Sequence, residues 1–269
     1  MVDVHGASTF QVSGDAYDSF MGRYSRELAD VFGDYCLPAP EGRFLDVGCG
    51  PGALTGVAVA RLGARSVAAV DPAPGFVQVC RHRHPDVDVR RAAAEELPFA
   101  DDEFDSAAAQ LVFHFVTDPA RAVAEMRRVV RPGGVLAATV WDFAEGMQLL
   151  RAFWDAALAL DSGAPDEAHV LRFGAPGELA RVFTDGGLGE VEETTATVTS
   201  RYRDFDELWE GFLAGIGPAG AYAVARPPED RDRLRTGLFD RLGRPSGEFT
   251  LTAVARMARA RVPAGPPML

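Results

Sequence analysis

The middle of the chain alternates short apolar runs with longer amphipathic ones. Apolar runs at 43–47, 66–70, 87–90, 104–109 and 134–141 predict five strands. Helical patterns separate these runs, which is typical of parallel strands in a sheet that helices cover on both faces. We therefore predict an α/β fold for this region.

The most clearly marked helix is predicted at residues 118–131. Asp118 supplies an N-cap, and Pro119 suits the first helical position. Positions i, i+4, i+7 and i+8 form one apolar face: Ala122, Met126, Val129 and Val130. The Pro-Gly-Gly sequence that follows ends the helix and turns the chain into the next strand.

Regions outside this alternating core are mainly helical in pattern. Residues 1–42, 146–185 and 204–242 are predicted to be helical, the last interrupted at 215–220 and 226–228. Strand patterns at 190–199 and 248–256 predict two further strands, separated by a helical insertion. We predict a single domain, 1–269, with a cofactor-binding core at 15–141. Residues 142–189 and 200–245 are expected to form a mostly helical cap and insertion on the acceptor side.

Composition and charge narrow the classes of partner. Of the 269 residues 47% are hydrophobic, which allows a sizeable core. The formal net charge of −12 disfavours nucleic acid and anionic membranes as partners, although it is compatible with a local basic groove. The oligomeric state is not predictable from these properties.

The cysteines and the N-terminal sequence indicate in which cellular compartment the protein is expected. Cys36, Cys49 and Cys80 lack disulfide or metal-site spacing, which is typical of a reducing compartment. The first ten residues lack the basic start and apolar run of a signal peptide. No stretch reaches the roughly 18 apolar residues that a membrane span needs. We expect a cytoplasmic protein.

Three glycines mark the junction between the first predicted strand and the next helix, in FLDVGCGPGAL at 44–54. Glycines at such a junction allow a tight turn and let a ligand approach the backbone N–H groups. The usual dinucleotide fingerprint is G-x-G-x-x-G, whereas Gly48, Gly50 and Gly52 follow a G-x-G-x-G spacing. A nucleoside-like cofactor other than a dinucleotide fits better, and a purely structural turn is the alternative.

Two aspartates accompany the loop and suggest the charge of that cofactor. Asp46 is expected to point into the cofactor cleft, where it would repel a pyrophosphate and attract a cationic amino acid group. Asp71 ends the second predicted strand and can accept hydrogen bonds from two ribose hydroxyls, although a helix-capping role is possible. S-adenosylmethionine, which carries an ammonium and a sulfonium, meets both conditions.

The motifs LDVGCGPG, VDP, AAAEELPFADDEFD, LVFHFVTDP and VVRPGG follow one another between residues 45 and 134. In this order they resemble the class I S-adenosylmethionine-dependent methyltransferases, in particular the small-molecule type that includes the ubiquinone/menaquinone methyltransferases. The resemblance covers about residues 15–141. It implies a doubly wound, Rossmann-like sheet of seven strands with an antiparallel last strand, and S-adenosyl-L-methionine as cofactor.

The resemblance also implies roles for individual residues. Asp46 would face the methionine ammonium, and Asp71 would hold the ribose hydroxyls. The other residues implied in cofactor binding line the amino acid and ribose, pack on the adenine, or run towards the transferred methyl: Gly48, Cys49, Gly50, Gly52, Pro72, Ala94, Glu95, Gln110 and Leu111. Tyr17 and Tyr24 are candidates for closing over the cofactor. Ala93 stands where the family often has an aspartate, so the usual side-chain contact with the adenine amino group is missing.

His114 is the candidate catalytic residue. It follows the fourth predicted strand, near the expected position of the methyl acceptor, where it could act as a general base. A pocket-lining or structural role is the favoured interpretation. His82 and His84 are expected to be exposed, and their spacing does not place them on one helical face for a metal. We predict no metal site.

Aromatic side chains outside the motifs are expected to be mostly core residues, with some lining an acceptor pocket. This set comprises Phe20, Tyr24, Phe143, Phe153, Trp154, Trp209, Phe212 and Tyr222.

The predicted function is methyl transfer from S-adenosylmethionine to the oxygen, nitrogen or carbon of a small molecule, by in-line displacement without a metal. Enzymes that methylate amino groups of nucleic-acid bases usually need Asn/Asp-Pro-Pro-aromatic after the fourth strand, and this chain has AQLV there. The acidic metal cluster of the catechol type is also missing. The alternatives are a protein that binds the cofactor without transferring methyl, and an NAD-dependent oxidoreductase.

Overall fold

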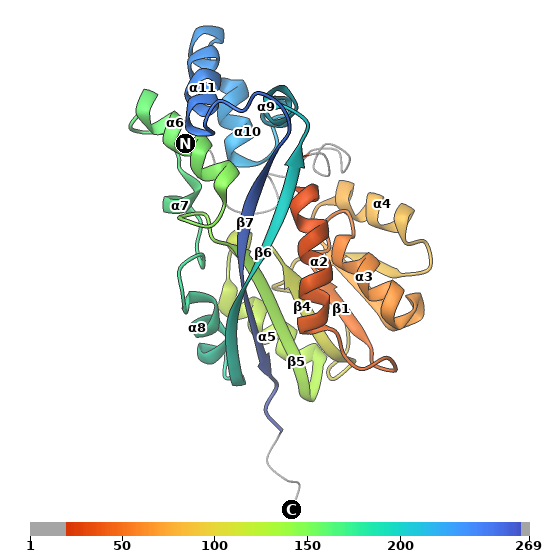
Figure 1. Cartoon of the computed structure of the whole chain (residues 1–269). Helices are drawn as coiled ribbons and strands as arrows, with labels where there is room; N and C mark the ends of the chain where they lie inside the picture. The colour runs from red at the N-terminus through yellow and green to blue at the C-terminus, as the bar shows by residue number, and fades with distance from the viewer. Residues whose placement is uncertain (1–19, 265–269) are drawn as a thin grey trace, which may run out of the picture.

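The five apolar runs of the central region form parallel strands of one seven-stranded sheet (Figure 1). The computed structural model describes residues 20–264. The strands are β1 (Phe44–Val47), β2 (Val67–Asp71), β3 (Asp88–Arg91), β4 (Phe104–Gln110), β5 (Val130–Trp141), β6 (Gly189–Tyr202) and β7 (Phe249–Arg261). Their order is β3-β2-β1-β4-β5-β7-β6, and β7 runs antiparallel to both β5 and β6. The predicted Rossmann-like fold with an antiparallel last strand is confirmed.

The helices lie on both faces of the sheet and at one of its ends. They are α2 (Gly22–Cys36), α3 (Ala53–Leu62), α4 (Pro74–Arg83), α5 (Pro119–Val129), α6 (Gln148–Leu160), α7 (Glu167–Val170), α8 (Glu178–Asp185), α9 (Phe205–Leu213), α10 (Gly217–Ala225) and α11 (Pro228–Arg241). Short 3₁₀ helices occur at η2 (Ala64–Ser66) and η3 (Phe113–Phe115). None of the helices in residues 20–264 has the length and apolar content to cross a membrane.

Two apolar cores form, one on each face of the sheet. Helices α2, α3 and α4 contribute to the first core, and α5 and α8 contribute to the second. Strands β1 and β2 are buried along their whole length because they have helices on both sides. This accounts for the continuous apolar runs that predicted these strands.

Helix α5 has the start and the apolar face predicted from its sequence. The Asp118 carboxylate accepts a hydrogen bond from the backbone N–H of Arg121 at 3.0 Å, and Pro119 is the first helical residue. Three of the predicted face residues are fully buried in the second core: Ala122, Met126 and Val129. The helix ends at Val129, earlier than predicted, and Val130 and the Pro-Gly-Gly sequence belong to β5.

A group of helices, α6, α9, α10 and α11, gathers at one end of the sheet (Figure 1). Helix α10 begins at Gly217 with Pro218 in its first turn, so the predicted interruption at 215–220 is shorter than expected. Helix α8 falls within the segment assigned to the cap, yet it packs on α5, β6 and β7 and buries Leu179 and Phe183 in the second core. This helix therefore belongs to the layers that cover the sheet.

Strand β7 continues five residues beyond its predicted end. In this extension Ala258 and Ala260 are buried, while Arg259 and Arg261 pair with Glu192 and Glu190 of β6. The small alanines carry little apolar signal in an alanine-rich sequence. The cross-strand ion pairs form only once β6 and β7 are adjacent.

Candidate active site

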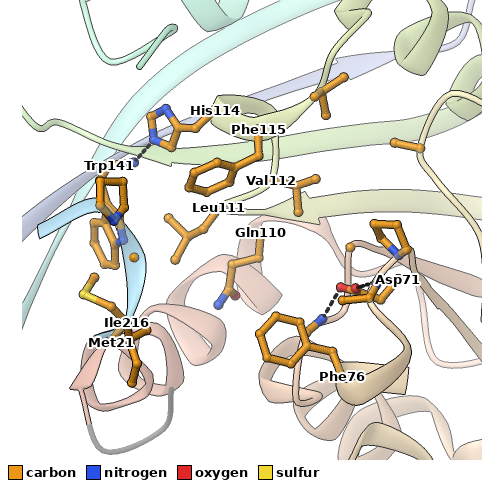
Figure 2. A pocket seen from close by; sticks show the side chains of 18 of the residues that line it. Met21, Asp71, Phe76, Gln110, Leu111, Val112, His114, Phe115, Trp141 and Ile216 are labelled. Atoms are coloured by element: carbon orange, nitrogen blue, oxygen red, sulfur yellow. Dashed lines mark hydrogen bonds between the residues drawn. The ribbon is translucent and has the colours of Figure 1, made fainter. Parts of the chain in front are cut away.

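A cavity of about 240 Å³ opens at the carboxyl ends of the parallel strands, beneath the helical cap. Figure 2 shows Asp71 and Phe76 at one end, His114 and Trp141 at the other, and Gln110 and Leu111 between them. Ile216, immediately before α10, also lines it. The cavity therefore joins the ends of β2 and β4 to the cap.

The glycine loop is tied to β2 and exposes its backbone to the cavity. The N–H groups of Gly48 and Cys49 donate to the carbonyl of Val70 at 2.8 and 2.9 Å. Gly50 has a φ of +52°, and a Cβ added there would have no neighbouring atom within 4 Å. Since Gly50 lines the cavity, the space that a side chain would fill is open to a ligand.

Asp71 lines the cavity and is held in place by two backbone groups. Its Oδ2 accepts from the N–H of Gly50 at 2.9 Å, and its Oδ1 accepts from the N–H of Ala73 at 2.8 Å. A carboxylate offers about four acceptor sites, so two remain for a ligand. Burial raises the pKa of Asp71 to about 6. The fixed carboxylate can accept two hydrogen bonds from hydroxyl groups.

Asp46 is fully buried and is not among the residues that line the cavity. Its Oδ2 accepts a hydrogen bond from the Thr55 hydroxyl at 2.6 Å. Its Oδ1 has no hydrogen-bond partner among residues 20–264. Burial, with a smaller contribution from the Asp71 charge, raises the pKa of Asp46 to about 7. Its predicted contact with an ammonium group stays a prediction, which the unpartnered oxygen supports.

Gln110 and Leu111 line the cavity where β4 ends. The Gln110 Nε2 donates to the carbonyl of Ser25 at 2.8 Å, while its buried Oε1 has no partner in the part of the chain that the structure describes. Leu111 has a φ of +62°, in the left-handed region that costs a non-glycine residue roughly 1–3 kcal/mol. Its N–H donates to Thr139 at 2.8 Å, which helps to hold this conformation.

Other predicted cofactor residues also border the cavity: Gly48, Pro72, Ala94 and Glu95, together with Ala93. The Glu95 Oε1 accepts from the N–H groups of Thr117 and Asp118 at 3.0 and 3.3 Å. The Glu95 carboxylate therefore fixes the segment that leads into α5.

Several predicted site residues lie elsewhere. Cys49, Gly52 and Tyr24 do not line the cavity, and Tyr17 lies outside the described residues. Tyr24 is fully buried, with its hydroxyl 3.1 Å from that of Tyr202, and burial raises its pKa far above the ordinary value. Its position gives no support to the prediction that it closes over a cofactor. Phe20 and Met21 line the cavity instead.

His84 supports the glycine loop from outside the cavity. Its ring is half-buried, and its Nε2 lies 3.1 Å from the carbonyl of Gly52, to which an Nε2–H can donate. A Cβ on Gly52 would approach the His84 ring to 2.9 Å. The prediction that His84 is exposed is therefore wrong, because the ring packs on the loop, whereas His82 is exposed as predicted.

His114 is buried, and both of its ring nitrogens bind the backbone. Its Nδ1 is 2.6 Å from the carbonyl of Arg172, which can only accept, and its Nε2 accepts from the N–H of Trp141 at 2.9 Å. These partners fix the neutral Nδ1–H tautomer. Desolvation by burial lowers the pKa of His114 to about 4. No ring nitrogen remains to accept a proton from a substrate, so the geometry favours the structural role.

Sequence reasoning missed several residues that line the cavity. Phe76, Met21 and Ile216 are apolar, and their helical patterns give no indication of a ligand. Glu167, on the short helix α7, is buried and lines the cavity, although a glutamate in such a helix is usually exposed. Within residues 20–264, no three His, Cys, Asp or Glu side chains are grouped closely enough to hold a metal ion.

Comparison with known proteins identifies the family. Residues 45–138 match a family model described as a methyltransferase domain. A malonyl-[acyl-carrier protein] O-methyltransferase of Dechloromonas aromatica is 32% identical over 228 residues, which cover 83% of this chain and 75% of that protein. The chain belongs to the class I S-adenosylmethionine-dependent methyltransferases.

Other relatives match a smaller part of this chain, or resemble it in fold alone. An uncharacterized methyltransferase of Mycobacterium tuberculosis is 42% identical over 109 residues, which cover 40% of this chain and 43% of that protein. The chain thus matches less than half the length of that relative. The structure of a phosphoethanolamine N-methyltransferase 2 of Haemonchus contortus has a TM-score of 0.57 at 17% identity. That alignment covers 93% of this chain and 57% of the other, and it shows the fold alone.

S-adenosylmethionine is the cofactor of this family, and the residues present fit it. Asp71 has acceptor capacity left for ribose hydroxyls, and Gly50 leaves open space beside the backbone. The two unpartnered oxygens, Asp46 Oδ1 and Gln110 Oε1, can accept hydrogen bonds and would attract a positive charge. The residues that line the cavity include no arginine or lysine, either of which would favour a pyrophosphate.

Proposed function

We propose that this methyltransferase family member transfers a methyl group from S-adenosylmethionine to a small molecule by direct displacement, without a metal. The observation that carries the proposal is the single cavity that joins the Asp71–Gly50 end to an apolar end under the cap. The residues proposed for the cofactor and those proposed for the acceptor thus border the same cavity.

The cofactor end of the cavity provides acceptors and backbone surface. Asp71 would accept from the ribose hydroxyls, and Gly48 and Gly50 would let the cofactor lie against the loop. Pro72 and Ala94 provide apolar surface for the adenine. The Gln110 Oε1 is the unpartnered acceptor at the cavity for the ammonium group, and the Asp46 charge lies buried behind the lining residues. These assignments rest on the lining residues and their free acceptor sites.

The acceptor end contributes alignment and the exclusion of water. When bound, S-adenosylmethionine supplies a methyl group already activated by the sulfonium. Trp141, Phe143 and Leu150 form an apolar wall around the space beyond Leu111. Alignment of this kind contributes up to about 7–11 kcal/mol in model reactions. His114 ties Trp141 to Arg172 and so fixes the wall, without acting as a base.

The position of the cavity under the cap and the charge of the chain support a class of acceptor. A cavity bounded by the cap admits a small molecule more readily than a nucleic acid, and a net charge of −12 repels phosphate backbones. We therefore propose a small-molecule acceptor and no nucleic-acid or membrane partner. The cytoplasmic location stays a prediction.

A direct test is methyl transfer from methyl-labelled S-adenosylmethionine to a panel of small phenols, amines and stabilised carbanions. We expect labelled product from at least one class, unchanged by a chelator. Binding of S-adenosylhomocysteine without labelling of any acceptor would contradict methyl transfer and support a cofactor-binding protein.

A further inference from the structure

Glu167 lines the cavity and is hydrogen-bonded to α6, the helix that supplies Leu150 to the apolar end. Its side chain is buried and borders the cavity with Trp141, Phe143 and Leu150. Its Oε2 accepts a hydrogen bond from the indole N–H of Trp154 at 2.8 Å. No other side chain among residues 20–264 forms a hydrogen bond or an ion pair with this carboxylate.

The adjacent residue, Asp166, is a buried carboxylate that does have a cationic partner. Asp166 is also buried, but Arg151 pairs with it at 2.8 Å, and the N–H of Ala168 donates to it at 3.0 Å. Arg151 also pairs with Asp155 at 2.8 Å. The arginine thus pairs with Asp166 and Asp155 and is not paired with Glu167.

No cationic side chain of the described residues borders the cavity beside Glu167. The residues that line the cavity include no arginine, and the sequence contains no lysine. Residues 1–19 and 265–269, outside the described part, contain neither arginine nor lysine. Burial raises the pKa of Glu167 to about 7, as expected for a carboxylate without a cationic partner.

The groups around Glu167 suit a cation with an apolar body. The lining includes the aromatic side chains Trp141 and Phe143, a residue type that attracts positive charge, and the aliphatic side chains Leu150 and Ile216, which favour hydrocarbon. The charged side chains that line the cavity are all acidic: Asp71, Glu95 and Glu167. A carboxylate or phosphate on the acceptor would therefore enter a cavity that repels it.

We propose that Glu167 binds a protonated nitrogen of the methyl acceptor, which makes the acceptor an amine with an aromatic or aliphatic body. This ammonium group anchors the acceptor, and because it has no lone pair the methyl group goes to another atom. The proposal rests on the proposed function, because it assigns the acceptor of the same cavity. Glu167 is the specificity-determining residue, and Trp154 is a positioning residue that orients its carboxylate. Acceptors whose only charged group is a carboxylate or a phosphate are excluded.

The test is calorimetric titration of the full chain, with and without saturating S-adenosylhomocysteine. The probes are matched sets of 2-phenylethylamine, 2-phenylethanol and 3-phenylpropionate, with homologues one carbon shorter and longer. We expect the amine to bind best and the carboxylate worst. In Glu167→Gln, which can still accept from Trp154, we expect amine affinity to fall at least about 30-fold, because a buried charge partner is lost.

Glu210→Gln is the matched control, since Glu210 is exposed on α9 and the same charge is removed outside the cavity. It should leave amine affinity unchanged, and S-adenosylhomocysteine affinity should be the same in both variants. The proposal is overturned if no amine binds, if a carboxylate binds best, or if Glu167→Gln keeps the amine preference. Failure of wild-type protein to bind S-adenosylhomocysteine overturns the proposed function instead, and the titrations without it still test Glu167.

Discussion

Gly50 donates its backbone N–H to the Asp71 carboxylate across 2.9 Å, which joins the glycine loop to the end of β2. The glycine loop and Asp71, which both indicated a cofactor in the sequence, are therefore joined by a hydrogen bond. Asp71 holds the loop with one acceptor site of its Oδ2 and faces the cavity with others. A change at Asp71 should affect both the loop and the ligand.

Asp71→Asn should weaken S-adenosylhomocysteine binding by about 10-fold to 100-fold. The variant loses the charge of an acceptor whose hydrogen bonds are worth about 1.5–3 kcal/mol each. Calorimetry of the folded variant measures the effect, and Asp86→Asn, at an exposed position, is the control. Unchanged affinity in folded Asp71→Asn would show that Asp71 does not bind the ribose hydroxyls.

Gly50→Ala should reduce cofactor affinity at least about tenfold with a modest loss of stability. The φ of +52° costs an alanine about 1–2 kcal/mol, and the new Cβ meets no protein atom within 4 Å, so it occupies ligand space. Gly177→Ala is a matched control, because Gly177 has a left-handed φ of +78° and equal space but precedes α8 outside the cavity. Equal affinities for the two variants would show that the loop backbone does not contact the ligand.

His114→Ala should destabilise the fold and leave S-adenosylhomocysteine affinity within about threefold of wild type. The substitution leaves the Trp141 N–H and the Arg172 carbonyl without their partner, at about 1–3 kcal/mol for each buried group. Urea unfolding measures the stability. If methyl transfer by the folded variant fell by orders of magnitude at saturating cofactor, His114 would be a base after all.

Asp46 should make the ligand-free protein less stable as the pH rises from 5 to 8. Its folded pKa of about 7 lies above the ordinary 3.8, so the native state binds more protons and loses this advantage as the carboxyl ionises. The change is of the order of 2 kcal/mol for these two pKa values. His114 acts in the opposite direction, since its folded pKa of about 4 costs stability as the pH falls from 6.5.

Comparison of Asp46→Asn with wild type isolates the contribution of Asp46, because His114 is present in both proteins. Urea unfolding at pH 5 and pH 8 should show that the variant gains stability relative to wild type at the higher pH. The same variant should bind S-adenosylhomocysteine more weakly if the unpartnered oxygen serves the ammonium group. A pH-independent difference between the two proteins would exclude the raised pKa.

The strands and the glycine loop could be predicted from the sequence because local signals determine them. Strands buried on both faces need continuous apolar residues, and a ligand-binding turn needs glycine where φ is positive. Asp71 could be recognised because a strand end in this fold always faces the same edge of the sheet. These features depend on a few neighbouring residues.

Tyr24 was expected both among the mostly core aromatic residues and as a residue that closes over the cofactor, and its spacing favours the core. Tyr24, Leu28 and Phe32 recur every four residues and are all fully buried on the inner face of α2. This spacing identifies a core position more directly than proximity to the motifs identifies a cofactor contact. The residues at the cavity, Phe20 and Met21, lie one turn earlier.

Glu167 shows what the sequence alone could not provide. Glu167 is buried, and its partner Trp154 lies thirteen residues earlier, so their hydrogen bond forms only in the folded chain. The His114 ring nitrogens likewise bind backbone groups of Arg172 and Trp141, which lie far away in sequence. Neither environment has a local sequence pattern.

The most direct test of the cofactor assignment is calorimetric titration of the full chain with S-adenosylhomocysteine, with NADH titrated in parallel. The account predicts saturable 1:1 binding of S-adenosylhomocysteine and no binding of NADH. Binding of NADH alone would contradict it, because the cavity would then favour a pyrophosphate beside Asp71 and Asp46.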